Sequence, residues 1–243
     1  MPGELTTFEN SDIHTTKVGD FTVTCFITNY FRQNAYIVTS LKSDEAIIID
    51  PGGRSEHITD FIRQRNVQLR QILLTHGHFD HIGALNPLCT TFSLNARIHE
   101  QDLKLARLAP FYALRFCNES LPAPRALLPY GDESEFPYAG RVIKILPLPG
   151  HTKGGVAIDF GDFVFTGDSL FHEKVGPTNY PESDLGNLLE GVSRLFTQLA
   201  PDSVIFPGHG RPWTIGEGRV WWETHKGQPP QYQIMRARKG SDV

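Results

Sequence analysis

The segment from His76 to His81, His-Gly-His-Phe-Asp-His, constrains this chain most, because it places three imidazoles and one carboxylate within six residues. Residues two apart in an extended chain project to the same side, so His76 and His78 can bind one ion together. If Asp80 caps a helix start, the turn directs Asp80 and His81 toward a second point. Nitrogen and oxygen donors without a thiol suit zinc, with iron and manganese as alternatives. A polar loop with structural histidines is the other interpretation, and the apolar run directly before the segment favours a metal site.

Three later residues share one context with this segment, because each directly or closely follows an apolar, strand-like run and is preceded by a glycine. They are His151, Asp168 and His209. In a layered α/β fold, the loops at one end of the strands gather at one edge, where sites are built. A glycine before each residue lets the backbone turn sharply and approach an ion closely.

Together these residues suffice for two neighbouring divalent ions. The first ion is expected to be bound by His76, His78 and His151. The second is expected to be bound by Asp80, His81 and His209, with Asp168 bridging the two ions. For Asp50, at the end of another apolar run, two roles stay open: orienting a ligand imidazole, or capping local turn amides. The remaining histidines are expected on the surface or in packing, namely His14, His57, His99, His172 and His225.

Composition indicates an ordinary globular protein, with 243 residues, 40 % hydrophobic and 21 % charged. The net charge of −4 argues against nucleic acid or an anionic membrane as partner. Residues 1–10 lack a signal-peptide pattern, and three cysteines at unrelated spacings indicate buried thiols, so we expect a cytoplasmic protein. No linker or repeat divides the chain, which predicts one domain over 1–243, with a core over about 21–215 and a tail over 216–243.

Apolar periodicity predicts strands over 21–27, 34–39, 45–50, 71–74, 141–146, 155–160, 163–166 and 203–206. Ser55 and Asp184 are expected to cap helices, and Gly161-Asp162 is expected to form a hairpin turn. Around residues 103–107 a helix is predicted that Pro110 ends. The aromatic stretch 111–116 that follows is either a flap that lines a substrate groove or a cover on the core, and both interpretations stay open.

The chain resembles metallo-β-lactamase-fold hydrolases, matching their five motifs from about Phe21 to Ile215. The matching residues are Asp50, the segment His76 to His81, His151, Asp168 and His209. Within that superfamily it is similar to the short hydroxyacylglutathione hydrolase (glyoxalase II) group, through Gly150-His151-Thr152, Thr166-Gly167-Asp168 and Pro207-Gly208-His209. The resemblance implies a four-layer αββα sandwich with two divalent metal ions at its edge.

The resemblance also implies a metal-dependent hydrolase, most specifically a thioesterase, acting on a small-molecule thioester or ester. Metal coordination lowers the pKa of water from 15.7 to about 7, so a metal-bound hydroxide is available to attack the carbonyl. Asp80 is the expected catalytic residue, since it can orient that hydroxide and accept its proton. The chain has Gly176-Pro177-Thr178-Asn179 where short members often carry Gly-Arg-Thr-Asp, and we do not expect the C-terminal helical domain of longer glyoxalase enzymes within these 243 residues. The thiol carrier and the oligomeric state are therefore left open.

Three other functions remain as alternatives. A mononuclear iron enzyme of the persulfide dioxygenase type would use His76, His151 and Asp168 as a facial triad. A lactonase would use the same centre on an ester. A non-enzymatic binding module is disfavoured, because every expected ligand position is filled.

Overall fold

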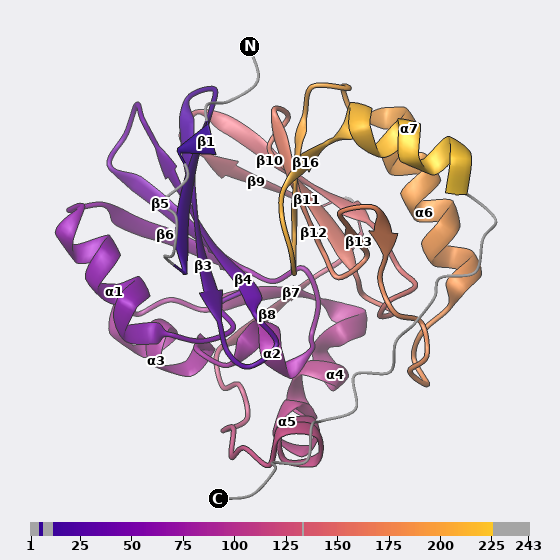
Figure 1. Cartoon of the computed structure of the whole chain (residues 1–243). Coiled ribbons are helices and arrows are strands. Elements are labelled where there is room, and N and C mark those ends of the chain that lie inside the picture. The colour runs from indigo at the N-terminus through magenta and orange to yellow at the C-terminus, as the bar shows by residue number, and fades with distance from the viewer. Residues whose placement is uncertain (1–4, 7–11, 133, 226–243) are drawn as a thin grey trace, which may run out of the picture.

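Two β-sheets face each other, with helices on both outer faces (Figure 1). The structure is a computed structural model that describes residues 5–6, 12–132 and 134–225. Residues 226–243, most of the expected tail, lie outside this range, and the single-domain boundaries stay a prediction. Within the described part of the chain, no helix is long and apolar enough to cross a membrane.

The first sheet has eight strands that neighbour one another in chain order. They are β1 (Leu5–Thr6), β2 (Ile13–Val18), β3 (Phe21–Thr28), β4 (Gln33–Ser40), β5 (Glu45–Ile49), β6 (Gln68–Leu73), β7 (Ala96–His99) and β8 (Leu127–Tyr130). Pairing is antiparallel from β1 to β5 and parallel from β5 to β8. The parallel half therefore directs the carboxyl ends of β5 and β6 to one edge.

The second sheet has six strands in the order β16-β15-β12-β11-β10-β9. They are β9 (Glu135–Tyr138), β10 (Arg141–Pro147), β11 (Val156–Asp159), β12 (Phe163–Gly167), β15 (Val204–Pro207) and β16 (Trp213–Thr214), while β13 (Leu170–Phe171) and β14 (Lys174–Val175) form a small separate hairpin. Only β12 and β15 run parallel among the pairs of this sheet, so their carboxyl ends also meet.

Helices cover the outer face of each sheet (Figure 1). The helices in the described part of the chain are α1 (Ser55–Gln64), α2 (Phe79–Ile82), α3 (Leu85–Phe92), the 3-10 turn η1 (Glu100–Asp102), α4 (Leu103–Arg107), α5 (Ala109–Cys117), α6 (Leu185–Gln198) and α7 (Ile215–His225). Of these, α1 and α3 lie outside the first sheet, α6 and α7 lie outside the second, and α5 lies at one end of the sandwich (Figure 1). Buried residues of α1 and α3 belong to one apolar cluster with the first sheet. Those of α6 and α7 belong to another cluster with the second sheet.

Alternation along each central strand explains the four layers. In β4, Tyr36 and Val38 pack between the two sheets, whereas Ile37 packs against the outer helices. In β12, Phe163 and Phe165 face the inter-sheet core, whereas Val164 faces α6. Because both faces of these strands are buried, they require continuous apolar runs. The expected αββα sandwich is confirmed, and every predicted strand is present with shifted ends.

Two expected helix caps are wrong. Helix α1 begins at Ser55, but Arg54 is its cap residue, and the carbonyl of Arg54 accepts the first helical hydrogen bond from Ile58. His78 precedes α2, so Asp80 lies inside the first turn instead of capping it. The expected cap at Asp184 is confirmed, because its carboxylate accepts from the Asn187 amide at 2.9 Å.

The aromatic stretch 111–116 is helical, although the sequence shows no helix signal after Pro110. Helix α4 ends at Arg107, and α5 starts directly afterwards at Ala109. Pro110 lies in the first turn of α5, where the missing N–H of proline would have no helical partner. The proline therefore separates two helices and does not end helical structure.

Candidate metal centre

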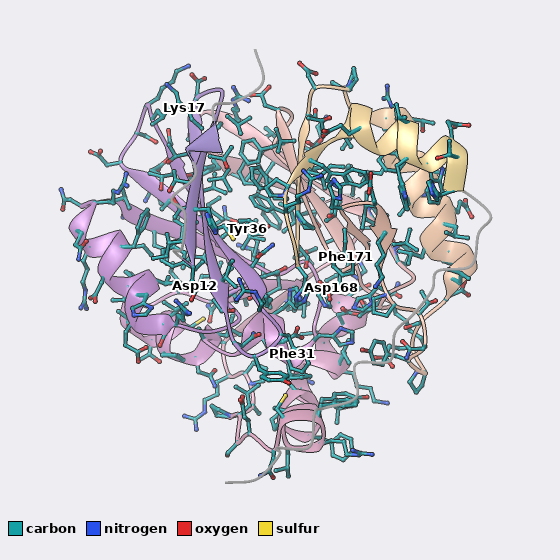
Figure 2. All side chains as sticks on the ribbon, viewed as in Figure 1. Asp12, Lys17, Phe31, Tyr36, Asp168 and Phe171 are labelled. Carbon is teal, nitrogen blue, oxygen red and sulfur yellow. The ribbon has the colours of Figure 1, made fainter. Side chains whose placement is uncertain are left out.

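The loops at one edge of the sandwich carry the residues that we expected to bind metal. The segment His76 to His81 follows β6, Asp168 follows β12, and His209 follows β15. His151 lies in the loop between β10 and β11. In Figure 2, Asp168 lies at the end of the sandwich nearer to α5. The sheet topology thus brings together residues that are up to 133 positions apart.

Backbone hydrogen bonds fix these loops against one another. The Val156 amide donates to the Thr75 carbonyl at 3.0 Å, which joins the second sheet to the first. The Gly208 amide donates to the Gly167 carbonyl at 2.8 Å, and the Gly208 carbonyl accepts from the Asn34 amide at 2.8 Å. The spacing of the loops is therefore set by the backbone, independently of any bound ion.

The first cluster contains His76, His78 and His151, whose donor atoms lie within 4.8 Å of one another. His151 Nε2 and His78 Nδ1 are only 2.9 Å apart. His76 and His151 are each 2 % exposed. Three nitrogen atoms converging at this spacing can occupy three positions of a tetrahedral site or one face of an octahedral site.

The second cluster contains Asp80, His81 and His209, again with donor atoms within 4.8 Å. Asp80 Oδ2 lies 3.4 Å from His209 Nε2 and 3.9 Å from His81 Nε2. This cluster mixes a carboxylate with two imidazoles, so it offers harder donors than the first.

Asp168 lies between the two clusters. One of its oxygens, Oδ1, is 3.1 Å from His81 Nε2. The other, Oδ2, is 3.4 Å from His209 Nε2 and 3.8 Å from His151 Nε2. The carboxylate thus contacts residues of both clusters, which is the placement that a bridging ligand requires.

The outer ring nitrogen of three histidines is held by an oxygen acceptor. His151 Nδ1 donates to the Pro177 carbonyl at 2.7 Å, and His209 Nδ1 donates to the Phe31 carbonyl at 3.0 Å. His81 Nδ1 donates to Asp50 Oδ2 at 3.0 Å. Because each acceptor fixes a proton on Nδ1, the neutral form of each ring carries its lone pair on Nε2, which faces the centre.

Asp50 also orients His76 through a threonine. The Thr75 hydroxyl donates to Asp50 Oδ2 at 2.5 Å, so its oxygen accepts from His76 Nδ1 at 3.0 Å. The Thr75 amide donates to Asp50 Oδ1 at 2.7 Å. Of the two roles that the sequence left open for Asp50, the structure favours orienting imidazoles. Asp50, His76 and His81 also lie within ligand distance of one another, but both Asp50 oxygens already accept hydrogen bonds.

Orphaned polar atoms show that the centre fits metal ions. His76 Nε2, His81 Nε2 and Asp168 Oδ1 are buried, and no hydrogen bond to any of them has acceptable geometry. Buried polar atoms without a partner carry a large desolvation cost. Imidazole and carboxylate donors at these positions are the ligand types that zinc, iron and manganese take.

The two clusters differ in their protonation. Burial, together with the neighbouring His78, lowers the pKa of His151 to about 4, and burial lowers the pKa of His76 well below its usual value. Burial would also lower the pKa of His209, but Asp168 raises it to about 10. His76 and His151 of the first cluster are therefore neutral imidazoles, whereas in the second cluster the carboxylates and imidazoles compensate one another's charge.

Gly208 shows how closely the chain approaches the centre. A Cβ atom at Gly208 would lie 2.2 Å from Asp168 Oδ1 and 2.7 Å from the His81 ring. Both contacts are shorter than van der Waals distance, so any side chain here would displace expected ligands. This is a physical reason for glycine next to His209.

A cavity of about 60 Å³ opens beside the second cluster. Asp80 lines it together with aromatic residues from the β3–β4 loop and α2, and with residues from α5: Tyr30, Phe31, Phe79, Ala113 and Cys117. Phe116 does not line the cavity but stacks on Phe79, with ring centroids 6.4 Å apart. Helix α5 thus contributes to the cavity wall and supports an aromatic residue in it, which favours the substrate-lining interpretation.

Sequence reasoning missed three residues at the centre. Tyr180 packs against His78 with ring centroids 5.3 Å apart, and Glu182 Oε1 lies 3.5 Å from His78 Nε2. Asp102 contacts both loops of the first cluster through hydrogen bonds. Only Asp102 had a usable signal, because it follows a strand in the same way as the expected ligands.

Comparison with known proteins agrees with this geometry. The metallo-β-lactamase superfamily profile matches residues 28–209. Hydroxyacylglutathione hydrolase GloC of Haemophilus influenzae is 34 % identical over 197 residues, covering 77 % of this chain and 90 % of GloC. BaeB of Bacillus velezensis, described as a probable polyketide biosynthesis zinc-dependent hydrolase, is 30 % identical over 175 residues, covering 72 % of this chain and 71 % of BaeB.

A solved structure shows the same fold. TTHA1623, crystallised in a di-iron-bound form, superposes with a TM-score of 0.71 at 32 % identity, covering 80 % of this chain and 96 % of that one. The profile match spans most of the chain, and the relatives are matched over most of their own length. This chain belongs to the metallo-β-lactamase superfamily.

Proposed function

We propose that this protein is a thioester hydrolase of the hydroxyacylglutathione hydrolase type that uses two divalent metal ions. The observation that carries the proposal is the pair of ligand clusters with Asp168 between them and orphaned donor atoms pointing into the centre. The similarity to GloC supports thioester chemistry. The dinuclear iron form of TTHA1623 and the zinc-dependent BaeB support divalent metals.

The first cluster would hold one ion through His76, His78 and His151, and the second would hold another through Asp80, His81 and His209. Asp168, which lies between the clusters, would be available to both ions. Such ions supply a water of lowered pKa and polarise the substrate carbonyl. Zinc is favoured by the imidazole-rich donor set, with iron or manganese as alternatives.

The protein's own groups position the reactants. Asp80 is the metal-cluster carboxylate that lines the cavity, so it is placed to orient the attacking water and to accept its proton. The water oxygen adds to the thioester carbonyl carbon, the carbon–sulfur bond breaks, and the thiolate leaves with the proton that Asp80 accepted. The imidazoles stay fixed during these steps, because their outer nitrogens are hydrogen-bonded.

We expect about two divalent ions per chain in purified, active protein, because the two ligand clusters are separate and both are complete. Elemental analysis of protein prepared without added metal measures this number. Chelator-stripped protein should lose activity and regain it with added Zn²⁺, Fe²⁺ or Mn²⁺. Folded, active protein with only trace metal would refute the proposal.

Shortening Phe116 is expected to change which acyl groups are hydrolysed fastest. Its ring stacks on Phe79 at the cavity wall, so Phe116→Ala removes the support of that wall while leaving all expected ligands in place. Ratios of kcat/KM across a series of acyl thioesters should shift by roughly 5- to 30-fold, since a hydrophobic contact contributes about 1–2 kcal/mol.

Leu114→Ala is the matched control, because Leu114 lies on the same helix and is 60 % exposed but does not line the cavity. Leu114→Ala should leave the ratios unchanged. Identical acyl preferences in the parent and Phe116→Ala would place the acyl group elsewhere.

A single activity panel separates the proposed reaction from its alternatives. Acyl thioesters of glutathione and of other thiols, lactones and a glutathione persulfide would be tested alongside metal analysis. Thioester turnover with the highest kcat/KM is the expected result. Oxygen consumption with the persulfide, or turnover of lactones alone, would replace the proposed function with a different reaction at the same centre.

A further inference from the structure

Asp102 is a buried carboxylate that lies behind the first ligand cluster. It ends the turn η1, directly after β7, and is 1 % exposed. Burial raises its pKa, and its hydrogen-bond donors are all neutral groups. A buried carboxylate is costly unless it is fully hydrogen-bonded, so its position calls for an explanation.

The hydrogen bonds of Asp102 join two loops that are far apart in the chain. Oδ2 accepts from the Gly77 amide at 2.9 Å and from the Thr152 hydroxyl at 2.8 Å. Oδ1 accepts from the Gly154 amide at 2.7 Å. Gly77 lies between His76 and His78, and Thr152 directly follows His151. One carboxylate thus connects the backbones that carry the three residues of the first cluster.

Close packing supports the same connection. A Cβ atom at Gly77 would lie 2.9 Å from the Asp102 carbonyl oxygen, and one at Gly154 would lie 2.7 Å from the Asp102 amide nitrogen. Both loops therefore approach the backbone of η1 as closely as glycine permits. The Asp50 carboxylate has no comparable contact with the His151 loop, since it accepts its hydrogen bonds from Thr75 and His81.

We propose that Asp102 is a positioning residue for the first metal ion, which sets the distance between the loop of His76 and His78 and the loop of His151. It acts through the backbone of both loops and does not bind the ion. The inference rests on the proposed first metal site but not on the reaction. Loss of the Asp102 carboxylate should weaken binding of the first ion and leave the second cluster intact.

Asp102→Asn is the sharpest test, because it keeps the size of the side chain. An amide offers one acceptor oxygen, so its NH₂ group must face the amide of either Gly77 or Gly154. To isolate the first site, Asp102→Asn is combined with His209→Ala, because the His209→Ala variant lacks an expected ligand of the second site. Calorimetric titration of chelator-stripped protein with Zn²⁺ should show about 10- to 100-fold weaker binding, as for other groups that orient ligands.

Asp102→Asn is also combined with His151→Ala, in which the second site keeps all of its expected ligands. In this background Asp102→Asn should leave the affinity of the second site for Zn²⁺ unchanged. Equal affinity with and without Asp102→Asn in both backgrounds would overturn the inference. Equal losses in both backgrounds would also overturn it, because the effect would then be general. A parent protein that binds one ion would refute the two-ion proposal, whereas the His209→Ala comparison would still decide the role of Asp102.

Asp159→Asn is the matched control. Asp159 is 9 % exposed, and its Oδ1 accepts from the Gly161 amide at 2.7 Å in the hairpin before β12, at the opposite end from Asp168. The Asp159→Asn substitution should leave Zn²⁺ affinity unchanged, and a loss of affinity equal to that of Asp102→Asn would overturn the inference.

If circular dichroism shows that the Asp102→Asn variant is unfolded, Thr152→Val in the His209→Ala background tests the inference instead. If Thr152→Val weakens Zn²⁺ binding and Thr152→Ser keeps the parental affinity, the inference is supported. If Thr152→Val binds Zn²⁺ with the parental affinity, the inference is contradicted.

Discussion

Replacing Asp168 with alanine is expected to abolish hydrolysis and to lower the metal content of both sites. Its two oxygens lie 3.1 Å from His81 Nε2 and 3.4 Å from His209 Nε2, and Oδ2 also lies 3.8 Å from His151 Nε2. Asp50 also lies near His76 and His81, but both of its oxygens already accept hydrogen bonds and it approaches the outer Nδ1 of His81. Asp168 instead approaches the inner Nε2 atoms of both clusters. Turnover should fall by more than about 10³-fold, because loss of one preorganised electrostatic group alone costs about 10²- to 10³-fold.

Elemental analysis of the Asp168→Ala variant measures its metal content, and steady-state kinetics measure its turnover. Asp162→Ala is the control, since Asp162 lies at the other end of β12 and pairs with the partly exposed Arg141 at 2.7 Å. Loss of a solvent-exposed ion pair has little effect on stability. If Asp168→Ala kept two ions and near-parental turnover, Asp168 would not bridge the ions.

Alanine at position 168 also removes charge compensation. Burial would raise the pKa of Asp168, but His209 and His81 hold it well below its usual value. The carboxylate in turn holds the pKa of His81 well above its usual value, against the effect of burial. Asp168→Asn, which keeps the shape, should therefore be prepared beside Asp168→Ala, so that a folding defect is distinguished from loss of the bridge.

The convergence of the candidate ligands was predictable, because the sequence places each of them after an apolar strand. Continuous apolar runs such as Ile47–Ile49 require burial on both faces, and parallel pairs such as β12 and β15 then align the strand ends. The spacing within His76 to His81 and the glycines before His151 and His209 added a local signal. Fold class and candidate ligands therefore follow from chain-local patterns combined with one rule about sheets.

The features that were missed depend on contacts between distant segments. Asp102 and Thr152 meet across 50 residues, and no periodicity indicates which polar residue after a strand will be buried. Tyr180 reaches His78 from a segment without regular structure. Pro110 predicted the end of α4 correctly, but proline is equally compatible with the first turn of a new helix, so the sequence could not distinguish an irregular stretch from α5.

Asp80→Asn is expected to reduce kcat by about 10²- to 10³-fold while changing KM little, because general base catalysis typically contributes 10²- to 10⁴-fold. Of Asp50, Asp80 and Asp168, Asp80 is the one that lines the cavity. Asp50 is 2 % exposed and already accepts three hydrogen bonds from Thr75 and His81, so it is buried behind the imidazoles and not placed to contact an attacking water. An asparagine at position 80 keeps the shape but cannot accept the proton of the attacking water.

Asp80 is also an expected ligand of the second ion, with Oδ2 3.4 Å from His209 Nε2, so the two roles must be separated. Turnover of Asp80→Asn would be measured at increasing Zn²⁺ until elemental analysis shows two ions per chain. Asp60→Asn, an equivalent change on the exposed face of α1, is the control and should behave as the parent. A kcat that stays low when both ions are bound supports proton transfer by Asp80. Recovery of the parental kcat with added metal would show that Asp80 acts only as a metal ligand. Another group at the centre would then have to accept the proton of the attacking water.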